Sequence, residues 1–297
     1  MTVAVLGCGY VGLALCEALE ERTVYGVRRS ADGLDQIEAT GATPIQADVT
    51  DDNDLEAVPD VDAIVYAVSA GGRSGDDARR AYVDGLRTVI ESFADRDHPP
   101  ERLLYTGSTS VYGDHGGDWV TEATPIEPTT EKTEILATAE RIARETAQSH
   151  DIDGTVVRFA GLYGPGRYRL KRYCSGPVTA GILNMLHRDD AAGILRWLLE
   201  TEPDTDTVLA VDDEPVEKWT LARWLAAECD TETPPLQTKA ERLEQGDLSV
   251  PAKRRLHTAK RCSNDWLRTA GYEFDHPTFR SGYRRAIESA TQTDAEE

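Results

Sequence analysis

The sequence predicts an α/β protein, a doubly wound parallel sheet with helices on both faces and a small C-terminal lobe. Two observations lead to this prediction. Short apolar runs alternate with segments of helical length through the first two thirds of the chain, an order typical of parallel sheets. From residue 213 onward the pattern changes to short helical segments such as "WTLARWLAAE" and "CSNDWLRTAGY".

The apolar runs are the expected strands, at 3–7, 23–27, 43–48, 62–69, 102–108, 154–161 and 206–212. The segments between them with helical length and pattern are 10–21, 77–95, 132–149 and 190–200. We therefore expect a sheet domain over 1–165, completed by a returning helix and strand at about 187–212. The remaining segments, 166–186 and 213–297, are expected to form a small substrate lobe.

The chain is strongly acidic, with 53 Asp and Glu against 32 Lys and Arg and a net charge of −21. This charge disfavours nucleic acid and anionic membranes as partners. Because the Debye length falls to about 3 Å at ~1 M salt, such self-repulsion is screened in a salty cytoplasm. We therefore expect a halophilic host, the alternative being an ordinary acidic protein. No run approaches the roughly 18 apolar residues of a membrane span, and a strand pattern begins at residue 2, so a cytoplasmic location is expected.

The cysteines and histidines show no ligand spacing. The five cysteines include no C-x-x-C pair, and their odd number suggests free thiols in a reducing compartment. The six histidines form no H-E-x-x-H or similar pattern. No metal site is predicted.

The first strand runs directly into the stretch "VLGCGYVGLALCEAL", which places Gly7, Gly9 and Gly12 in G-x-G-x-x-G register. Between a strand and a helix, this is the fingerprint of a Rossmann dinucleotide-binding domain. Gly7 permits the tight turn, Gly9 lets a pyrophosphate approach the backbone, and Gly12 allows close helix–strand packing. The helix start at Tyr10 and Val11 offers N–H groups and a positive dipole end to the phosphates. A glycine-rich turn without a ligand is the alternative.

The ends of the next strands suggest which dinucleotide is bound. Arg28 and Arg29 follow the second strand, where an NAD-preferring enzyme would carry Asp or Glu for the ribose 2′-hydroxyl. Arginine suits a 2′-phosphate, so NADP is expected and NAD is the less favoured cofactor; two solvated arginines are the alternative. Asp48, which ends the third strand, and Val49, which follows it, are expected beside the adenine. The small residues that end the fourth strand leave room for the ribose and nicotinamide; they are Ala67, Val68 and Ser69.

Together with "STSVYG", "VVRFAGLYGPGR", "NMLHRDDAA" and "NDWLRTAGYEF", these features resemble the extended short-chain dehydrogenase/reductases, the NAD-dependent epimerase/dehydratase family, over residues 1 to about 285. The resemblance implies that Ser108 hydrogen-bonds the reacting oxygen of the substrate. It also implies that three consecutive residues flank the nicotinamide, namely Ala160, Gly161 and Leu162.

The same resemblance implies a substrate cleft lined by Ser110, Tyr163 and Arg167. For Tyr163 and Arg167, packing or a surface charge is an equally good interpretation. His187 is better explained as a loop histidine before a helix cap at Asp189 or Asp190. The family's usual pairing helices, here 77–95 and 132–149, imply a possible homodimer.

One feature departs from the family. Its base is a Tyr followed four residues later by a Lys, expected here at about 131–133, but the sequence reads "EKT" and no Y-x-x-x-K occurs in the chain. Lys132 could stand in if burial lowered its pKa, the alternative being an exposed lysine at a helix start. The leading hypothesis is an atypical oxidoreductase or epimerase/dehydratase acting on a small molecule such as a sugar. The alternative is a non-catalytic NADP(H)-sensing protein.

Overall fold

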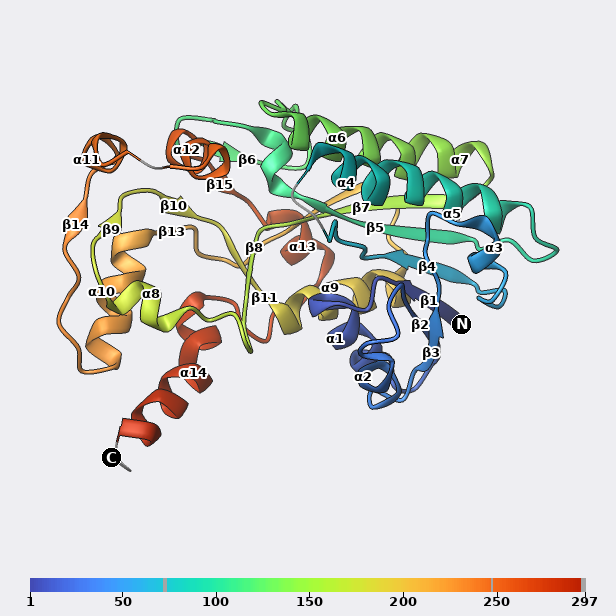
Figure 1. Cartoon of the computed structure of the whole chain (residues 1–297), viewed down its shortest axis with the longest axis horizontal. Helices are drawn as coiled ribbons and strands as arrows, with labels where there is room; N and C mark the ends of the chain where they lie inside the picture. The colour runs from blue at the N-terminus through green and yellow to red at the C-terminus, as the bar shows by residue number, and fades with distance from the viewer. Residues whose placement is uncertain (72–73, 247, 295–297) are drawn as a thin grey trace. The chain divides into compact units, whose positions relative to one another are not determined.

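The computed structural model describes residues 1–71, 74–246 and 248–294 (Figure 1). The chain divides into two compact units. Unit 1 contains Met1–Val111, Ile126–Phe159 and Ala191–Ala210, and unit 2 contains Tyr112–Pro125, Ala160–Asp190 and Val211–Glu297. The two units are described in turn.

Within its described residues, unit 1 is built on a seven-stranded parallel sheet in the order β12-β7-β5-β4-β1-β2-β3. The expected strands are all present: β1 (Thr2–Leu6), β2 (Thr23–Arg28), β3 (Thr43–Gln46), β4 (Ala63–Tyr66), β5 (Arg102–Ser108), β7 (Asp153–Phe159) and β12 (Thr207–Ala210). The chain winds outward from β1 to β3 and then returns to β4, on the other side of β1. This reversal creates a switch point between β1 and β4, where doubly wound sheets bind ligands.

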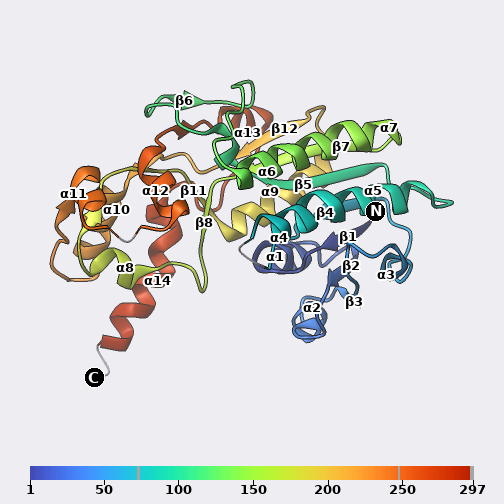
Figure 2. The ribbon, with the colours of Figure 1, turned by 45° about the horizontal axis from the view of Figure 1, so that its top comes forward.

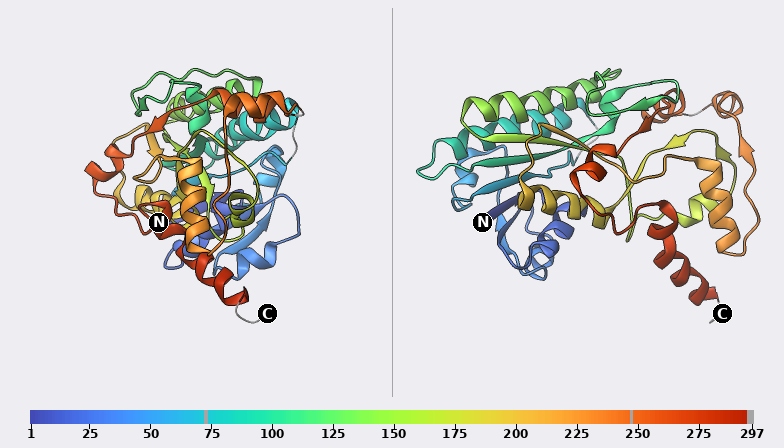
Figure 3. Two further views of the ribbon diagram at one scale, coloured as in Figure 1. Left: turned by 90° about the vertical axis from the view of Figure 1, so that its left-hand side faces the viewer. Right: turned by 180° about the vertical axis from the view of Figure 1, so that it is seen from behind.

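Helices cover both faces of this sheet (Figures 1 and 3). One face carries α1 (Tyr10–Ala18) and α9 (Arg188–Thr201), and the other carries α4 (Gly75–Arg79), α5 (Gly85–Ala94), α6 (Glu131–Arg141) and α7 (Ala147–Ser149). Two π-helical turns, η1 (Arg80–Asp84) and η3 (Ile142–Thr146), join α4 to α5 and α6 to α7. Every expected helix is present. Two further helices, α2 (Leu34–Glu38) and α3 (Asp52–Leu55), are too short to show a period in the sequence. None of the helices in the described chain is long and apolar enough to cross a membrane.

A buried ion pair lies beneath the carboxyl end of β5. Glu140 of α6 is 0% exposed and Arg158 of β7 is 3% exposed. Arg158 donates from Nε to both carboxylate oxygens (3.2 and 3.1 Å) and from Nη2 to Oε2 (2.8 Å). A Cβ on Gly107 would lie 3.1 Å from Glu140 Oε1, so this glycine makes room for the pair next to Ser108.

Unit 2 has short strand pairs and helices. The strand pairs are β6 (Trp119–Val120) with β15 (Arg261–Cys262), β8 (Gly161–Tyr163) with β11 (Met185–His187), β9 (Val178–Thr179) with β14 (Leu236–Gln237), and β10 (Ile182–Leu183) with β13 (Val216–Glu217). The helices are α8 (Leu170–Cys174), α10 (Lys218–Glu228), α11 (Lys239–Glu244), α12 (Val250–His257), α13 (Asp265–Ala270) and α14 (Phe279–Asp294). Helices α8 and α10 lie side by side (Figure 2). Tyr163, Leu221, Leu225, Phe279 and Tyr283 belong to a shared apolar core.

The unit boundaries differ from the expected domain boundaries in two places. Residues 112–125 and 160–165, expected in the sheet domain, belong to unit 2. The physical reason is strand pairing, since β6 pairs with β15 and β8 pairs with β11. Strands of two or three residues are too short for a sequence pattern to reveal their partners.

Candidate functional site

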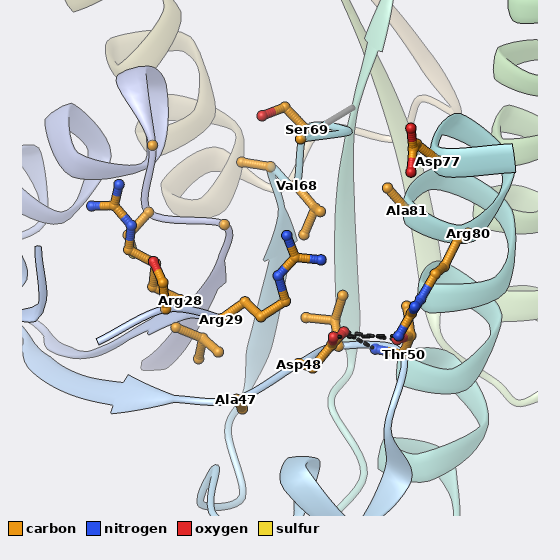
Figure 4. A pocket seen from close by; sticks show the side chains of 18 residues that line it. Arg28, Arg29, Ala47, Asp48, Thr50, Val68, Ser69, Asp77, Arg80 and Ala81 are labelled. Atoms are coloured by element: carbon orange, nitrogen blue, oxygen red, sulfur yellow. Dashed lines mark hydrogen bonds and ion pairs between the residues drawn. The ribbon is translucent and has the colours of Figure 1, made fainter. Parts of the chain in front are cut away.

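A pocket of about 380 Å³ opens in unit 1 where β1, β2, β3 and β4 end (Figure 4). This is the switch point of the sheet, the usual ligand position in such folds. Nine of the residues expected to bind the cofactor line it: Gly7, Gly9, Arg28, Arg29, Asp48, Val49, Ala67, Val68 and Ser69. They come from four strand ends far apart in sequence, so the fold brings together what the sequence shows as separate signals.

The glycine turn between β1 and α1 is shaped as its motif requires. Gly7 has φ +98°, and a Cβ there would lie 2.6 Å from the backbone of Ala67 and Val68. A Cβ on Gly12 would clash with the carbonyl oxygen of Gly7, so this glycine lets α1 pack closely on the turn. A Cβ on Gly9 would meet no atom within 4 Å, which leaves its side of the backbone open for a ligand.

No described side chain neutralises the positive N-terminal end of helix α1. It begins at Tyr10 with Gly9 as its N-cap, and its first turn includes Val11 and Gly12. In this described segment no side chain caps the helix, and the first turn carries no acidic residue. The positive end of the helix dipole therefore keeps its capacity to stabilise a phosphate.

Three arginines and two aspartates line the pocket: Arg28, Arg29, Arg80, Asp48 and Asp77. These side chains carry one net positive charge, in a chain whose total is −21. A local positive excess on so acidic a protein favours an anionic ligand.

The two arginines at the end of β2, Arg28 within the strand and Arg29 directly after it, point in different directions. In Figure 4 the guanidinium of Arg29 reaches into the middle of the pocket, whereas that of Arg28 turns the other way. A Cβ on Gly33 would clash with Arg28, and Arg28 Nη1 is buried without a hydrogen-bond partner among the described residues. Arg29 is exposed, so it is the arginine that can meet an incoming phosphate without rearrangement.

Asp48 is held by the third arginine and by Thr50. Its Oδ1 accepts hydrogen bonds from the N–H (3.0 Å) and the hydroxyl (2.7 Å) of Thr50, and Arg80 Nη2 lies 3.6 Å from Oδ2. Burial opposes ionisation of Asp48, but the Thr50 hydrogen bonds and the charges of Arg80 and Arg29 outweigh it and hold its pKa below the usual value. Asp48 therefore stays a charged hydrogen-bond acceptor at the pocket wall.

Sequence reasoning missed Arg80, Thr50, Asp77 and Ser30 as pocket residues. Arg80 and Asp77 lie on the helical segment 75–94, whose existence the sequence predicts. Which face of that helix meets the strand ends depends on packing, so no local signal identifies them. Ser30 follows directly after the arginine pair, and its position could have been inferred from theirs.

The hydroxyls at the end of β5 form a small network. Thr106 donates to the carbonyl of Tyr66 (3.2 Å). Ser108 Oγ donates to Ser110 Oγ (3.0 Å) and accepts from the N–H of Ser110 (3.2 Å). Both serines are half-buried, so they have partners within the chain and retain access to solvent.

The stand-in role expected of Lys132 is not supported. Lys132 is exposed in the first turn of α6, so the burial on which that role depends is absent. The neighbouring Thr133 is buried, but its hydroxyl is used in the capping box with Thr130. This correction leaves the site without an identified acid–base side chain.

The expected substrate residues of unit 2 are placed as follows. Tyr163 is 3% exposed and stacks on Tyr283 with ring centroids 5.1 Å apart, while its hydroxyl packs against Gly282. Arg167 is exposed. Because Tyr163 is buried, packing explains this residue better than contact with a substrate does. Gly161 and Leu162 form β8 with Tyr163, and Ala160 directly precedes it.

His187 was expected in a loop, but it is the last residue of β11 and is 2% exposed. Burial and, to a smaller extent, the charge of the nearby His276 lower its pKa to about 4, although Asp189 opposes the shift. His187, Asp189 and His276 each place one nitrogen or oxygen atom within 4.8 Å of those of the other two. Histidine spacing in the sequence could not reveal this cluster, because its members are far apart in the chain.

Comparison with known proteins gives consistent results. The model of the NAD-dependent epimerase/dehydratase family matches residues 3–200. Protein YeeZ of Escherichia coli K12 is 31% identical over 210 residues, covering 67% of this chain and 73% of YeeZ. A 3-diazoavenalumate denitrifying reductase of Streptomyces is 29% identical over 314 aligned residues, covering 96% and 100%. A solved structure of a conserved protein of unknown function from Silicibacter pomeroyi is 26% identical with a TM-score of 0.77, covering 100% and 99%.

The family match spans the sheet strands β1 to β7 and continues into α9, and it includes the glycine turn and the four strand ends that form the pocket. The nucleotide-binding half of the expected site is therefore the part that the match covers best. The chain belongs to the NAD-dependent epimerase/dehydratase family.

Proposed function

We propose that the protein is an NADP(H)-dependent oxidoreductase that reduces or oxidises a small molecule without the Tyr–Lys pair of its family. The observation that carries this proposal is the arginine-lined pocket at the ends of β1 to β4. The similarity to a protein named as a reductase, across 96% of this chain, supports redox chemistry over epimerisation or dehydration.

The selectivity for NADP(H) rests on Arg29, with Arg28 beside it. A 2′-phosphate would add charge-assisted hydrogen bonds that a 2′-hydroxyl cannot make, each contributing roughly 1.5–3 kcal/mol. No carboxylate replaces these arginines at the end of β2 to bind a free 2′-hydroxyl. Asp48 and Val49 are proposed beside the adenine, and Ala67, Val68 and Ser69 beside the ribose and nicotinamide.

The chemical step would use the nicotinamide for hydride transfer and Ser108 to orient the substrate oxygen. The N–H of Ser110 points at Ser108 Oγ, so that hydroxyl is pre-oriented. A neutral hydroxyl is a poor base, so the proton would come from a substrate group or from water. Substrates that need a strong general base are therefore poor candidates.

The proposal is tested with Arg29→Ala and Arg28→Ala, titrated with NADPH and NADH by tryptophan fluorescence. Arg29→Ala is expected to weaken NADPH binding about tenfold or more and to leave NADH within about threefold. Arg79→Ala, on the exposed side of α4, is the matched control. An equal loss for both cofactors would reject the 2′-phosphate role.

The second candidate function is a non-catalytic NADP(H) sensor. The exposure of Lys132 favours it, since no proton-transfer group has been identified. A substrate screen with NADPH separates the two functions. Tight NADPH binding with no carbonyl or imine substrate consumed would favour the sensor.

A further inference from the structure

A buried histidine, a half-buried carboxylate and a second histidine converge in unit 2. His187 ends β11, Asp189 lies in the first turn of α9, and His276 precedes α14. One ligand atom from each residue lies within 4.8 Å of the ligand atoms of the other two, and the two imidazole centroids are 3.9 Å apart. Ligands bonded to one Zn²⁺ at roughly 2.0–2.2 Å lie about 3–3.5 Å from each other, so small side-chain movements would complete such a site.

The imidazole of His187 is oriented as a metal ligand would be. Its Nε2 lies 3.4 Å from the hydroxyl of Tyr168, and its Nδ1 accepts from the N–H of Asp189 (3.3 Å). The ring proton therefore belongs on Nε2. The lone pair of Nδ1 accepts the N–H of Asp189 in a long hydrogen bond, which an ion bound at Nδ1 would replace. Metal-binding histidines usually donate their second N–H to such an outer partner.

The two carboxylate oxygens of Asp189 have different neighbours. Arg188 donates from Nε to Oδ1 (2.8 Å), which leaves Oδ2 facing Nδ1 of His187 at 3.7 Å. Ligating carboxylates commonly have one oxygen fixed in this way by a neighbour. The side chain of Asp189 is 35% exposed, which gives an ion a route from solvent.

His276 is anchored to the same helical turn that carries Asp189. The buried carboxylate of Asp190 accepts from the N–H of Asp275 (2.8 Å) and from the N–H of His276 (3.0 Å). Asp190 is 0% exposed, and the Tyr272 hydroxyl donates to its carbonyl (3.2 Å). The backbone of His276 is therefore held in place beside His187.

Stacking alone does not account for this arrangement. An aromatic stack needs no ring nitrogen beside a carboxylate, and phenylalanine would fill the same volume without a polar atom to bury. Here both rings are histidine, and the nitrogen nearest the carboxylate is the one that can accept.

We propose that His187, Asp189 and His276 bind one divalent transition-metal ion of the Zn²⁺ type. Two imidazoles and one carboxylate suit Zn²⁺, Co²⁺ or Fe²⁺, whereas Mg²⁺ and Ca²⁺ prefer ligand sets made of oxygen. Three protein ligands leave at least one position for water. The ion would join the start of α9 to the segment before α14, independently of how the nucleotide pocket is used.

The test is a titration of the full, untagged chain with Co²⁺, followed by visible absorption. The titration is done at about 1 M KCl. Salt at this concentration screens the nonspecific attraction of Co²⁺ to the acidic surface. One Co²⁺ per chain is expected, with the intense bands of a four- or five-coordinate ion, and Zn²⁺ should displace it. His187→Ala, Asp189→Asn and His276→Ala are each expected to weaken binding at least about tenfold.

His98→Ala and Asp97→Asn are the matched controls, since both residues are exposed in unit 1, and they should bind Co²⁺ as the wild type does. Circular dichroism without metal checks that the variants fold. Asp189→Asn keeps the test decisive if a histidine variant does not fold, because this side chain is only half-buried. The proposal is overturned if the spectrum remains that of hydrated Co²⁺, or if Asp189→Asn binds as tightly as the wild type.

Discussion

The buried ion pair under β5 allows a quantitative prediction. Replacing Glu140 with Gln removes the carboxylate charge that faces the Arg158 guanidinium, while both side chains remain at most 4% exposed. Breaking a buried pair on one side typically costs about 3–5 kcal/mol of the free energy of unfolding, because a charge is left uncompensated in a medium of low polarity. The three N–H···O contacts, the shortest 2.8 Å, place this pair at the upper end of that range.

The assay is urea unfolding followed by circular dichroism at neutral pH. Glu145→Gln is the matched control, since its side chain is 67% exposed and its Arg141 partner lies 3.4 Å away; a loss below about 1 kcal/mol is expected. The double variant Glu140→Leu with Arg158→Met should recover most of the lost stability, since a packed apolar pair needs no desolvation. A loss below about 1 kcal/mol in Glu140→Gln, equal to that of the control, would refute the reasoning.

Three further predictions concern burial, chemistry and charge. Burial raises the pKa of Asp212 well above its usual range, so its protonated form stabilises the fold at acidic pH and this contribution is lost as pH rises. Asp212→Asn should therefore raise Tm increasingly between about pH 5 and pH 8; a Tm lowered throughout would contradict it. Ser108→Ala should lower turnover of any substrate found by about 10²-fold while leaving the NADPH Kd within about threefold, and unchanged turnover would remove its catalytic role. With a net charge of −21, Tm should rise from about 0.1 to 2 M KCl, and a flat or falling curve would contradict a halophilic adaptation.

The sheet was predictable because its strands are short apolar runs, and helix-length segments follow four of them, β1, β4, β5 and β7. The glycine turn was predictable for a stronger reason. Gly7 and Gly12 are required by backbone geometry, and that requirement appears in the sequence as glycine at fixed spacing. Arg28 and Arg29 could be placed because they directly follow a strand whose end lies at the switch point.

What the sequence could not show depends on packing between distant segments. Lys132 lies three and four residues before the buried Ile135 and Leu136, a spacing that suggests a shared helical face, yet Lys132 is exposed. His187 and His276 have no local signal in common, since a buried carboxylate at Asp190 joins their segments. The same holds for Arg80, which lines the pocket because η1 places it beside Thr50 and Asp48, after the end of β3.

The central claim is that the arginine-lined pocket of unit 1 selects NADP(H). The most direct test is the ratio of the Kd values of the wild-type chain for NADH and NADPH, measured side by side at one salt concentration. NADPH is expected to bind about tenfold or more tightly than NADH, as one charge-assisted hydrogen bond to the 2′-phosphate requires. Equal affinities, or tighter binding of NADH, would contradict it.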